Sequence, residues 1–211
     1  MRLRNVKNAF NIIEENRDIC IDDPTLYKGN WKSLSSKDNN SKIYLEVGCG
    51  KGKFLNSMAK ENTDILFIGI EMMSSVICRA ITKVKESKTP NVKLLNKDCE
   101  HILDYFSLHE IDKIFINFPD PWPKARHEKR RLTSPRFLDK YKIILKEDGI
   151  IRLKTDNYDL YNYSLETIIP LLKDGYKYGE VDYNIPIVET EFETKFRMNG
   201  NPIYYIEGSF K

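Results

Sequence analysis

Short apolar segments alternate with amphipathic segments from residue 43 to residue 172, and this alternation constrains the fold more than any other feature. Five apolar segments are predicted strands: residues 43–47, 65–70, 92–96, 111–117 and 150–154. Each precedes a predicted helix, at residues 51–60, 72–87, 99–106, 135–146 and 158–172. Five strand–helix units with short links predict an α/β fold with a doubly wound parallel sheet.

Both ends of the chain depart from this alternation. Residues 176–183 and 203–206 are predicted as two final strands with no helix between them, and an antiparallel closure is the simplest arrangement. Residues 3–16 place apolar side chains on one face of a predicted short helix, and a polar stretch follows. We therefore expect an N-terminal arm and linker over residues 1–42 and a main domain over residues 43–211.

Composition narrows the functional class only slightly. The 211 residues are 41% hydrophobic and 31% charged, as expected for one globular α/β domain. A net charge of +3 does not demand a nucleic-acid partner, so that case depends on local clustering. The four cysteines form no C-x-x-C pair, which indicates neither a metal site nor a disulfide framework and fits the cytoplasm. We expect no signal peptide, and no apolar run approaches the ~20 residues that span a bilayer.

Acidic residues lie at or just after the ends of all five predicted strands. In open α/β sheets, ligands bind outside the carboxyl ends of the strands, so these acids should share one edge. They are Glu46, Glu71, Asp98, Asp120 and Asp156. Each alone could be a solvated loop carboxylate or a helix cap, and Asp98 is placed to cap the helix that begins at residue 99. Their joint placement favours a ligand site.

The glycine-rich turn after the first strand indicates the kind of ligand. Gly48 and Gly50 let the backbone approach a ligand closely, although a tight turn alone also needs glycine. Glu46 puts a negative charge where a pyrophosphate would lie, which argues against a dinucleotide and suits an ammonium group. Glu71 suits a ribose diol, and Asp98 suits an adenine amino group. Together these groups describe S-adenosylmethionine.

A proline-rich loop follows the fourth predicted strand. Pro119, Pro121 and Pro123 fix φ at alternate positions and set the direction of Asp120. We expect Asp120 to face the methyl-donor end of the cofactor. The loop is similar to the Asn/Asp-Pro-Pro-aromatic loop of amino-methyltransferases. Trp122 could stack on a base or be a core or rim aromatic.

A basic run follows this loop directly. Its five cations are opposed only by Glu128 and are candidates for phosphate contacts: Lys124, Arg126, Lys129, Arg130 and Arg131. A run of this kind is otherwise a solvated helix start. A later segment could receive a base or be a plain polar loop: Thr190, Glu191, Phe192 and Glu193. The three histidines do not cluster, which argues against a metal site or a nucleophilic hydrolase.

These segments resemble the bacterial tRNA (guanine-N7)-methyltransferases of the TrmB type. The matching pieces are residues 45–52, 69–71, Asp98, 118–131, 153–156 and 190–193, with Arg2, Arg4 and Trp31. The Phe-Pro-Asp-Pro-Trp-Pro-Lys segment from residue 118 is long and specific. Phe192 stands where this family commonly has Tyr, which removes a hydroxyl and keeps the ring.

The resemblance implies a class I S-adenosylmethionine-dependent methyltransferase fold, Rossmann-like, with a mostly parallel seven-stranded sheet and an antiparallel C-terminal strand. It implies methyl transfer to N7 of guanosine 46 in the tRNA variable loop. It assigns the cofactor to Glu46, Glu71, Asp98 and Asp120, with Asp120 catalytic, and the glycine-rich turn adds Gly48 and Gly50 to the expected cofactor site. It assigns the substrate to Lys124, Asp156 and residues 190–193, and RNA contacts to residues 124–129, which include Arg126 and Lys129. The basic run adds Arg130 to the expected RNA contacts. No metal is implied, and monomer and homodimer both stay open.

Guanine N7 already presents a lone pair, so its methylation needs no general base. We therefore expect Asp120 to orient the guanine and to favour the developing cation. Two alternatives stay open at this point. One is an exocyclic-amine methyltransferase acting on nucleic acid or protein, and the other is a non-catalytic RNA-binding module.

Overall fold

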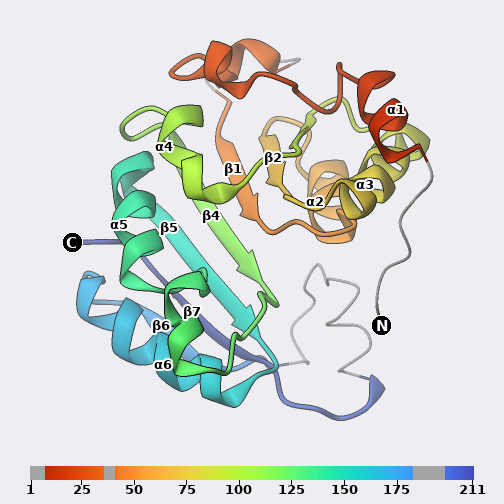
Figure 1. Cartoon of the computed structure of the whole chain (residues 1–211). Helices are drawn as coiled ribbons and strands as arrows, with labels where there is room; N and C mark the ends of the chain where they lie inside the picture. Colours follow the sequence, from red (N-terminus) through yellow and green to blue (C-terminus); the bar gives the residue numbers. More distant parts are fainter. Residues whose placement is uncertain (1–7, 36–40, 183–197) are drawn as a thin grey trace. The chain divides into compact units, whose positions relative to one another are not determined.

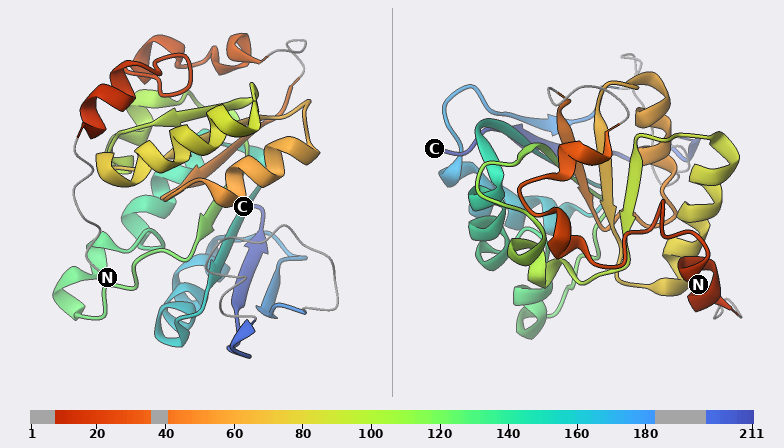
Figure 2. Two further views of the ribbon diagram at one scale, coloured as in Figure 1. Left: turned by 90° about the vertical axis from the view of Figure 1, so that its right-hand side faces the viewer. Right: turned by 90° about the horizontal axis from the view of Figure 1, so that it is seen from above.

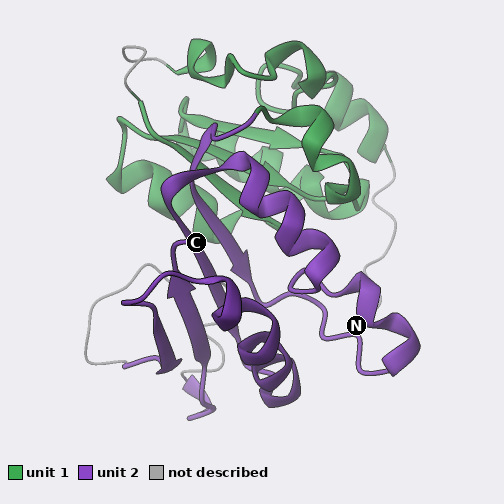
Figure 3. Ribbon diagram, turned by 90° about the vertical axis from the view of Figure 1, so that its left-hand side faces the viewer, with its two compact units in different colours: residues 1–107 green, residues 108–211 purple. Residues whose placement is uncertain are grey.

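The computed structural model describes residues 8–35, 41–182 and 198–211. Figure 1 shows the chain coloured along its sequence. The chain divides into two compact units, residues 1–107 and residues 108–211, which Figure 3 colours green and purple. Each unit is described by itself below.

Unit 1 contains three parallel strands in the order β3-β2-β1. They are β1 (Ile43–Val47), β2 (Leu66–Ile70) and β3 (Val92–Leu95). Ile43 pairs with Leu66, and Phe67 pairs with Val92. All five residues of β2 are buried, which agrees with the expectation for a strand covered on both faces.

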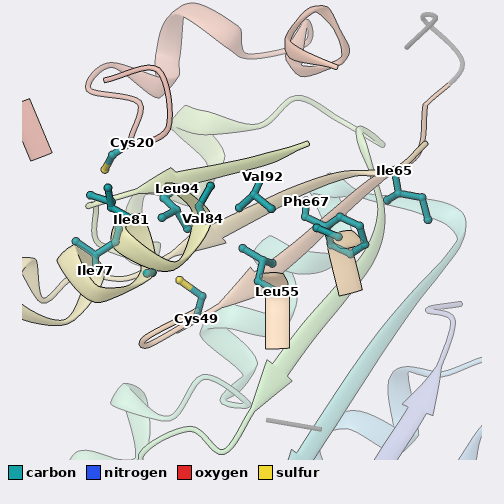
Figure 4. Close-up of a cluster of buried hydrophobic side chains, with 12 residues drawn as sticks. Cys20, Cys49, Leu55, Ile65, Phe67, Ile77, Ile81, Val84, Val92 and Leu94 are labelled. Atoms are coloured by element: carbon teal, nitrogen blue, oxygen red, sulfur yellow. The ribbon is translucent and has the colours of Figure 1, made fainter. Parts of the chain in front are cut away.

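The main helices of unit 1 pack their apolar faces against these strands. They are α2 (Lys53–Glu61), α3 (Ser74–Ser87) and a short pair, the 3-10 helix η3 (Cys99–His101) and α4 (Ile102–Tyr105). Figure 4 shows Leu55 of α2 and Ile77 and Ile81 of α3 in one cluster with Phe67 and Leu94. All five are at most 1% exposed. Burial on this scale is worth roughly 1.5–3 kcal/mol for each large apolar side chain.

The described N-terminal residues also pack onto unit 1. Helix α1 covers Ala9–Glu14, within the predicted range, and the 3-10 helices η1 (Pro24–Tyr27) and η2 (Trp31–Leu34) were not predicted. Cys20 forms an isolated parallel bridge with Leu94 of β3. Trp31 is fully buried, and its indole Nε1–H donates to the carbonyl of Tyr105 at 2.9 Å.

Unit 2 contains four strands in the order β4-β5-β7-β6. They are β4 (Ile111–Asn117), β5 (Leu145–Thr155), β6 (Lys177–Glu180) and β7 (Tyr204–Gly208). Strands β4 and β5 are parallel, whereas β7 is antiparallel to both β5 and β6, which confirms the predicted closure. The helices are η4 (Ala125–Arg130), α5 (Pro135–Ile144), α6 (Tyr158–Ile168) and η5 (Ile169–Leu171).

Strand β5 begins earlier than its sequence predicts. Helix α5 ends at Ile144 rather than at residue 146, and β5 begins at once with Leu145, which is 1% exposed. Ile111 pairs with Leu145 and the next registered pair is Lys113 with Ile150, so β5 contains an irregularity here. The sequence predicts a helix to residue 146 and a strand from residue 150, whereas the structure has residues 145–149 in β5.

The described strands are thus ordered β3-β2-β1 in unit 1 and β4-β5-β7-β6 in unit 2, and β7 runs antiparallel to both of its neighbours. The predicted α/β class, with a mostly parallel sheet and an antiparallel C-terminal strand, is confirmed. Figure 2 shows α2 and α3 beside the strands of unit 1, and α6 beside β5 and β7 of unit 2. Within the described ranges, every helix is too short or too polar to cross a membrane.

Candidate functional site

The glycine-rich turn after β1 lies against the end of β2. The backbone N–H of Gly48 donates to the carbonyl of Ile70 at 2.8 Å. Gly48, Gly50 and Gly52 all have positive φ, at 74°, 57° and 69°. A Cβ at Gly50 would meet nothing within 4 Å, whereas a Cβ at Gly52 would lie 2.8 Å from the Cβ of Ala80. Gly50 therefore leaves open space beside the backbone, and Gly52 is needed for packing against α3.

The carboxylate of Glu71 joins this turn to the start of α3. Its Oε2 accepts from the N–H of Gly50 at 3.2 Å, and its Oε1 accepts from the N–H of Met73 at 2.8 Å. The Asn96 amide, at the end of β3, donates to the carbonyl of Glu71 at 2.9 Å. One carboxylate and one amide thus connect the ends of β1, β2 and β3. The sequence indicates Glu71 as a site residue but does not indicate the hydrogen bond of Asn96. The only sign of that role in the sequence is the position of Asn96 directly after β3.

Glu46 and Asp98 lie in contrasting surroundings. Glu46 is 3% exposed in β1, whereas Asp98 is exposed and its Oδ1 accepts from the N–H of Glu100 at 2.9 Å. Asp98 is therefore a helix cap, the alternative that its sequence position left open. Burial, followed by the carboxylates of Glu46 and Glu71, raises the pKa of the Cys49 thiol well above its usual value. Cys49 stays protonated and does not supply a nucleophile.

The Pro-Asp-Pro-Trp loop of unit 2 has a strained backbone. Phe118 at its start donates its N–H to the carbonyl of Lys154 at 2.8 Å. Phe118 and Trp122 have positive φ, at 49° and 43°, although neither is glycine. A left-handed conformation at such residues costs about 1–3 kcal/mol each and is concentrated at functional sites. Asp120, between them, is exposed.

Arg131 holds this loop from the far end of the basic run. Its Nε donates to the carbonyl of Pro121 at 3.1 Å, and its Nη2 donates to the carbonyl of Trp122 at 3.2 Å. Its guanidinium carbon lies 4.2 Å from the centre of the Tyr163 ring. The Tyr163 hydroxyl donates to Oε1 of Glu128 at 3.0 Å. Burial, then this hydrogen bond, raises the pKa of Tyr163 to about 12.

Trp122 lies at the rim and has two charged or polar neighbours. The guanidinium carbon of Arg130 is 5.0 Å from the centre of its ring, and the ring of His127 meets it edge-on at 5.5 Å. The indole is half-buried. The basic run itself forms the 3-10 helix η4, and its candidate phosphate contacts Lys124, Arg126, Lys129 and Arg130 are exposed.

The remaining predicted site residues are placed as follows. Asp156 is exposed just after β5, beside Asn157, whose Oδ1 caps α6 by accepting from Leu160 N–H at 2.8 Å. Thr190, Glu191, Phe192 and Glu193, like Arg2 and Arg4, lie outside the described residues. Unit 1 brings together the ends of its three strands, with Glu46, Gly48, Gly50, Glu71 and Asp98. Unit 2 brings Asp120, the basic run and Asp156 to the ends of β4 and β5. Across the described ranges, no group of three or more His, Cys, Asp and Glu side chains could hold a metal ion.

Solved structures share this fold. A 16S rRNA methyltransferase, KamB, has a TM-score of 0.65 at 13% identity, covering 87% of this chain and 93% of that one. A phosphoethanolamine N-methyltransferase of Haemonchus contortus, in complex with S-adenosyl-L-methionine, has a TM-score of 0.52 at 11% identity, covering 85% and 51%. At these identities the likeness concerns the fold alone.

Sequence relatives identify the family. A family model described as "Putative methyltransferase" matches residues 40–206. The tRNA (guanine-N(7)-)-methyltransferase of Halalkalibacterium halodurans is 43% identical over 221 residues, covering 100% of this chain and 96% of the relative. The enzyme of that name from Bacillus subtilis strain 168 is 44% identical over 213 residues, covering 98% of each chain. The chain therefore belongs to the tRNA (guanine-N(7)-)-methyltransferase family.

Proposed function

We propose that this protein transfers a methyl group from S-adenosylmethionine to N7 of guanosine in tRNA, at position 46 of the variable loop. The observation that carries the proposal is the identity of 43% and 44%, over essentially the whole chain, to relatives named for this activity. A tRNA substrate places the reaction in the cytoplasm. Both monomer and homodimer are compatible with the proposal.

The residues of unit 1 fit the polar groups of S-adenosylmethionine. Glu46, buried in β1, supplies a carboxylate for the ammonium group. Glu71 is held by two backbone N–H groups, and a carboxylate has about four acceptor sites, so it can also receive ribose hydroxyls. Asp98 accepts from the adenine amino group in this scheme. The open space beside Gly50 supports close approach of the ligand to the backbone. When bound, the cofactor supplies an electrophilic methyl group on a sulfonium.

Asp120 binds and orients the guanine and does not accept a proton from it. The lone pair of N7 is free in guanine, and the methylated base is a cation. The carboxylate of Asp120 accepts from the donor edge of the base, and its charge favours the cationic transition state. The strained loop backbone supports this role, because a fixed carboxylate needs no reorganisation during the reaction.

The exposed cations of η4 hold the RNA. Lys124, Arg126, Lys129 and Arg130 contact phosphates and position the tRNA without reading its sequence. Asp156 and residues 190–193 complete the site around the guanine in the proposal.

Nucleoside mass spectrometry tests the proposal most simply. A tRNA with guanosine 46 is incubated with the protein and with cofactor labelled in its methyl group. We expect labelled N7-methylguanosine, and none when position 46 is adenosine. Label in another nucleoside would contradict the assignment of N7.

One observation favours a second candidate, an exocyclic-amine methyltransferase. The Asp-Pro-aromatic order at Asp120 to Trp122 is similar to the loop by which amino-methyltransferases receive a target amine. Chemistry separates the two, because borohydride followed by aniline cleaves RNA at N7-methylguanosine and not at an N-methylated amine. Calorimetry with S-adenosylmethionine separates both enzymes from a non-catalytic RNA-binding module, which would give no heat of binding.

A further inference from the structure

The five cations of the basic run do not share one environment. Four of them, Lys124, Arg126, Lys129 and Arg130, are exposed, whereas Arg131 is half-buried. The side chain of Arg131 turns back onto the Pro-Asp-Pro-Trp loop instead of facing solvent. We infer that Arg131 is a positioning residue, which fixes the loop that carries Asp120, and that it is not one of the RNA-binding cations.

The geometry of the guanidinium supports this role. Nε and Nη2 donate to the carbonyls of two consecutive residues, Pro121 at 3.1 Å and Trp122 at 3.2 Å. Nε also lies 3.4 Å from the Trp122 carbonyl. A planar fork of donors can hold two neighbouring carbonyls at once, whereas a lysine ammonium is a point charge on a flexible stem. Arginine is therefore required here for its shape as well as its charge.

Tyr163 of α6 supports the guanidinium from its other side. The ring centre is 4.2 Å from the guanidinium carbon, within the range of a cation–π interaction. The Tyr163 hydroxyl also donates to Glu128 of η4 at 3.0 Å. One helix thus anchors both the loop clamp and the basic helix.

The segment just after Arg131 is fastened to the same helix. Ser164 donates from its Oγ to the Oγ of Thr133 at 2.9 Å, and both side chains are fully buried. Thr167 donates from its hydroxyl to the carbonyl of Thr133 at 3.0 Å. The backbone two residues after Arg131 is therefore held in place by α6. A positioning residue needs such a fixed backbone.

Trp122 is the residue whose conformation depends on this clamp. Its φ of 43° is unfavourable for a tryptophan, and its carbonyl is one of the two that Arg131 holds. Without the clamp, Trp122 can relax to a more favourable φ. Asp120 lies two residues before it, so its carboxylate would lose its fixed direction.

Kinetics distinguishes a clamp from a phosphate contact, and this part of the inference rests on the proposed methyl transfer. For Arg131→Lys we expect kcat to fall by about ten- to a hundred-fold, as for a misplaced catalytic group, with the tRNA KM within about two-fold. The slope of binding against log salt stays unchanged, because no phosphate contact is lost. A Lys variant that keeps wild-type kcat, or any Arg131 variant that lowers the salt slope by about one unit, would overturn the inference.

Acrylamide quenching tests the clamp without reference to any activity. The chain has two tryptophans, and Trp31 is fully buried, so quenching reports mainly on Trp122. We expect Arg131→Lys and Arg131→Gln to raise the quenching constant about two-fold. Tyr163→Leu should raise it as well, whereas Tyr163→Phe, which keeps the ring, should not.

Circular dichroism melting confirms that each variant is folded at the temperature of measurement. If the quenching constant is unchanged in folded Arg131→Lys and Tyr163→Leu, Arg131 does not fix the conformation of the Pro-Asp-Pro-Trp loop and the inference is wrong. If the wild-type protein methylates no tRNA, the proposed function fails while the quenching result still decides the inference.

Discussion

The glycine-rich turn of unit 1 and the Pro-Asp-Pro-Trp loop of unit 2 reach similar backbone conformations by different means. The turn takes positive φ at glycines, where it costs little, and hydrogen bonds to Ile70 and Glu71 at the end of β2 hold it. The loop takes positive φ at Phe118 and Trp122, and a side chain from the far end of the basic run holds it. The conformation of the turn therefore follows from its glycines, whereas the loop reaches the same conformation with residues that disfavour it and that a side chain must hold. Substitutions at the two places should differ accordingly.

The largest effect is expected at Asp120, the residue that the strained loop presents. Asp120→Ala should lower kcat by about a thousand-fold, the scale for removing one preorganised electrostatic group. Asp120→Asn keeps an acceptor and should lose less. Because no proton is removed from N7, the pH profile of kcat should be the same in the wild type and in Asp120→Asn. In particular, the wild type should show no titration between about pH 6 and pH 9 that is lost in Asp120→Asn. Rapid-quench measurements across that range check this, and such a titration would make Asp120 a general base.

Glu71→Gln probes the glycine-rich turn. Its carboxylate accepts from Gly50 N–H and Met73 N–H, and a glutamine amide has only one oxygen to offer them. We expect cofactor affinity to fall by about ten- to a hundred-fold and stability to fall by about 0.5–1.5 kcal/mol, the net contribution of one hydrogen bond, because the Met73 N–H is exposed to water. Calorimetry and denaturant unfolding measure the two effects. The matched control is Glu61→Gln, at the exposed end of α2, where neither quantity should change; an equal loss in both variants would contradict the role of Glu71.

Two glycine substitutions separate packing from backbone conformation within the turn. Gly52→Ala puts a Cβ 2.8 Å from Ala80 at a φ of 69°, so we expect a loss of about 2–4 kcal/mol of unfolding free energy. Gly50→Ala meets open space at a φ of 57°, so only the conformational cost of about 1–2 kcal/mol applies. Urea unfolding of the two variants checks the order. Equal losses would show that Gly52 is not constrained by α3.

The smallest effect is expected at Arg126, an exposed cation of η4. Arg126→Ala should raise the tRNA KM about three- to ten-fold at moderate salt and reduce the salt slope by about one unit. Its kcat should be almost unchanged, in contrast to Arg131→Lys. Steady-state kinetics at several salt concentrations provides the comparison, and an unchanged slope would remove Arg126 from the phosphate contacts.

The sequence predicted the features that depend on nearby residues. Strand periodicity gave the parallel sheet and its antiparallel closure, and strand ends gave Glu46 and Glu71. The contacts of Arg131 were not predictable, because nothing near residue 131 indicates a partner at Tyr163 of α6. Arg131 therefore resembled its neighbours in the basic run. The early start of β5 was missed because residues 146–149 have the composition of a turn, and they lie between the registered pairs that Leu145 and Ile150 make with β4.

Cleavage mapping of methylated tRNA tests the central claim most directly. A tRNA transcript is incubated with the protein and labelled S-adenosylmethionine, treated with borohydride and aniline, and resolved on a sequencing gel. The account predicts label incorporation together with strand scission at guanosine 46. Label incorporation without scission at that guanosine would contradict it.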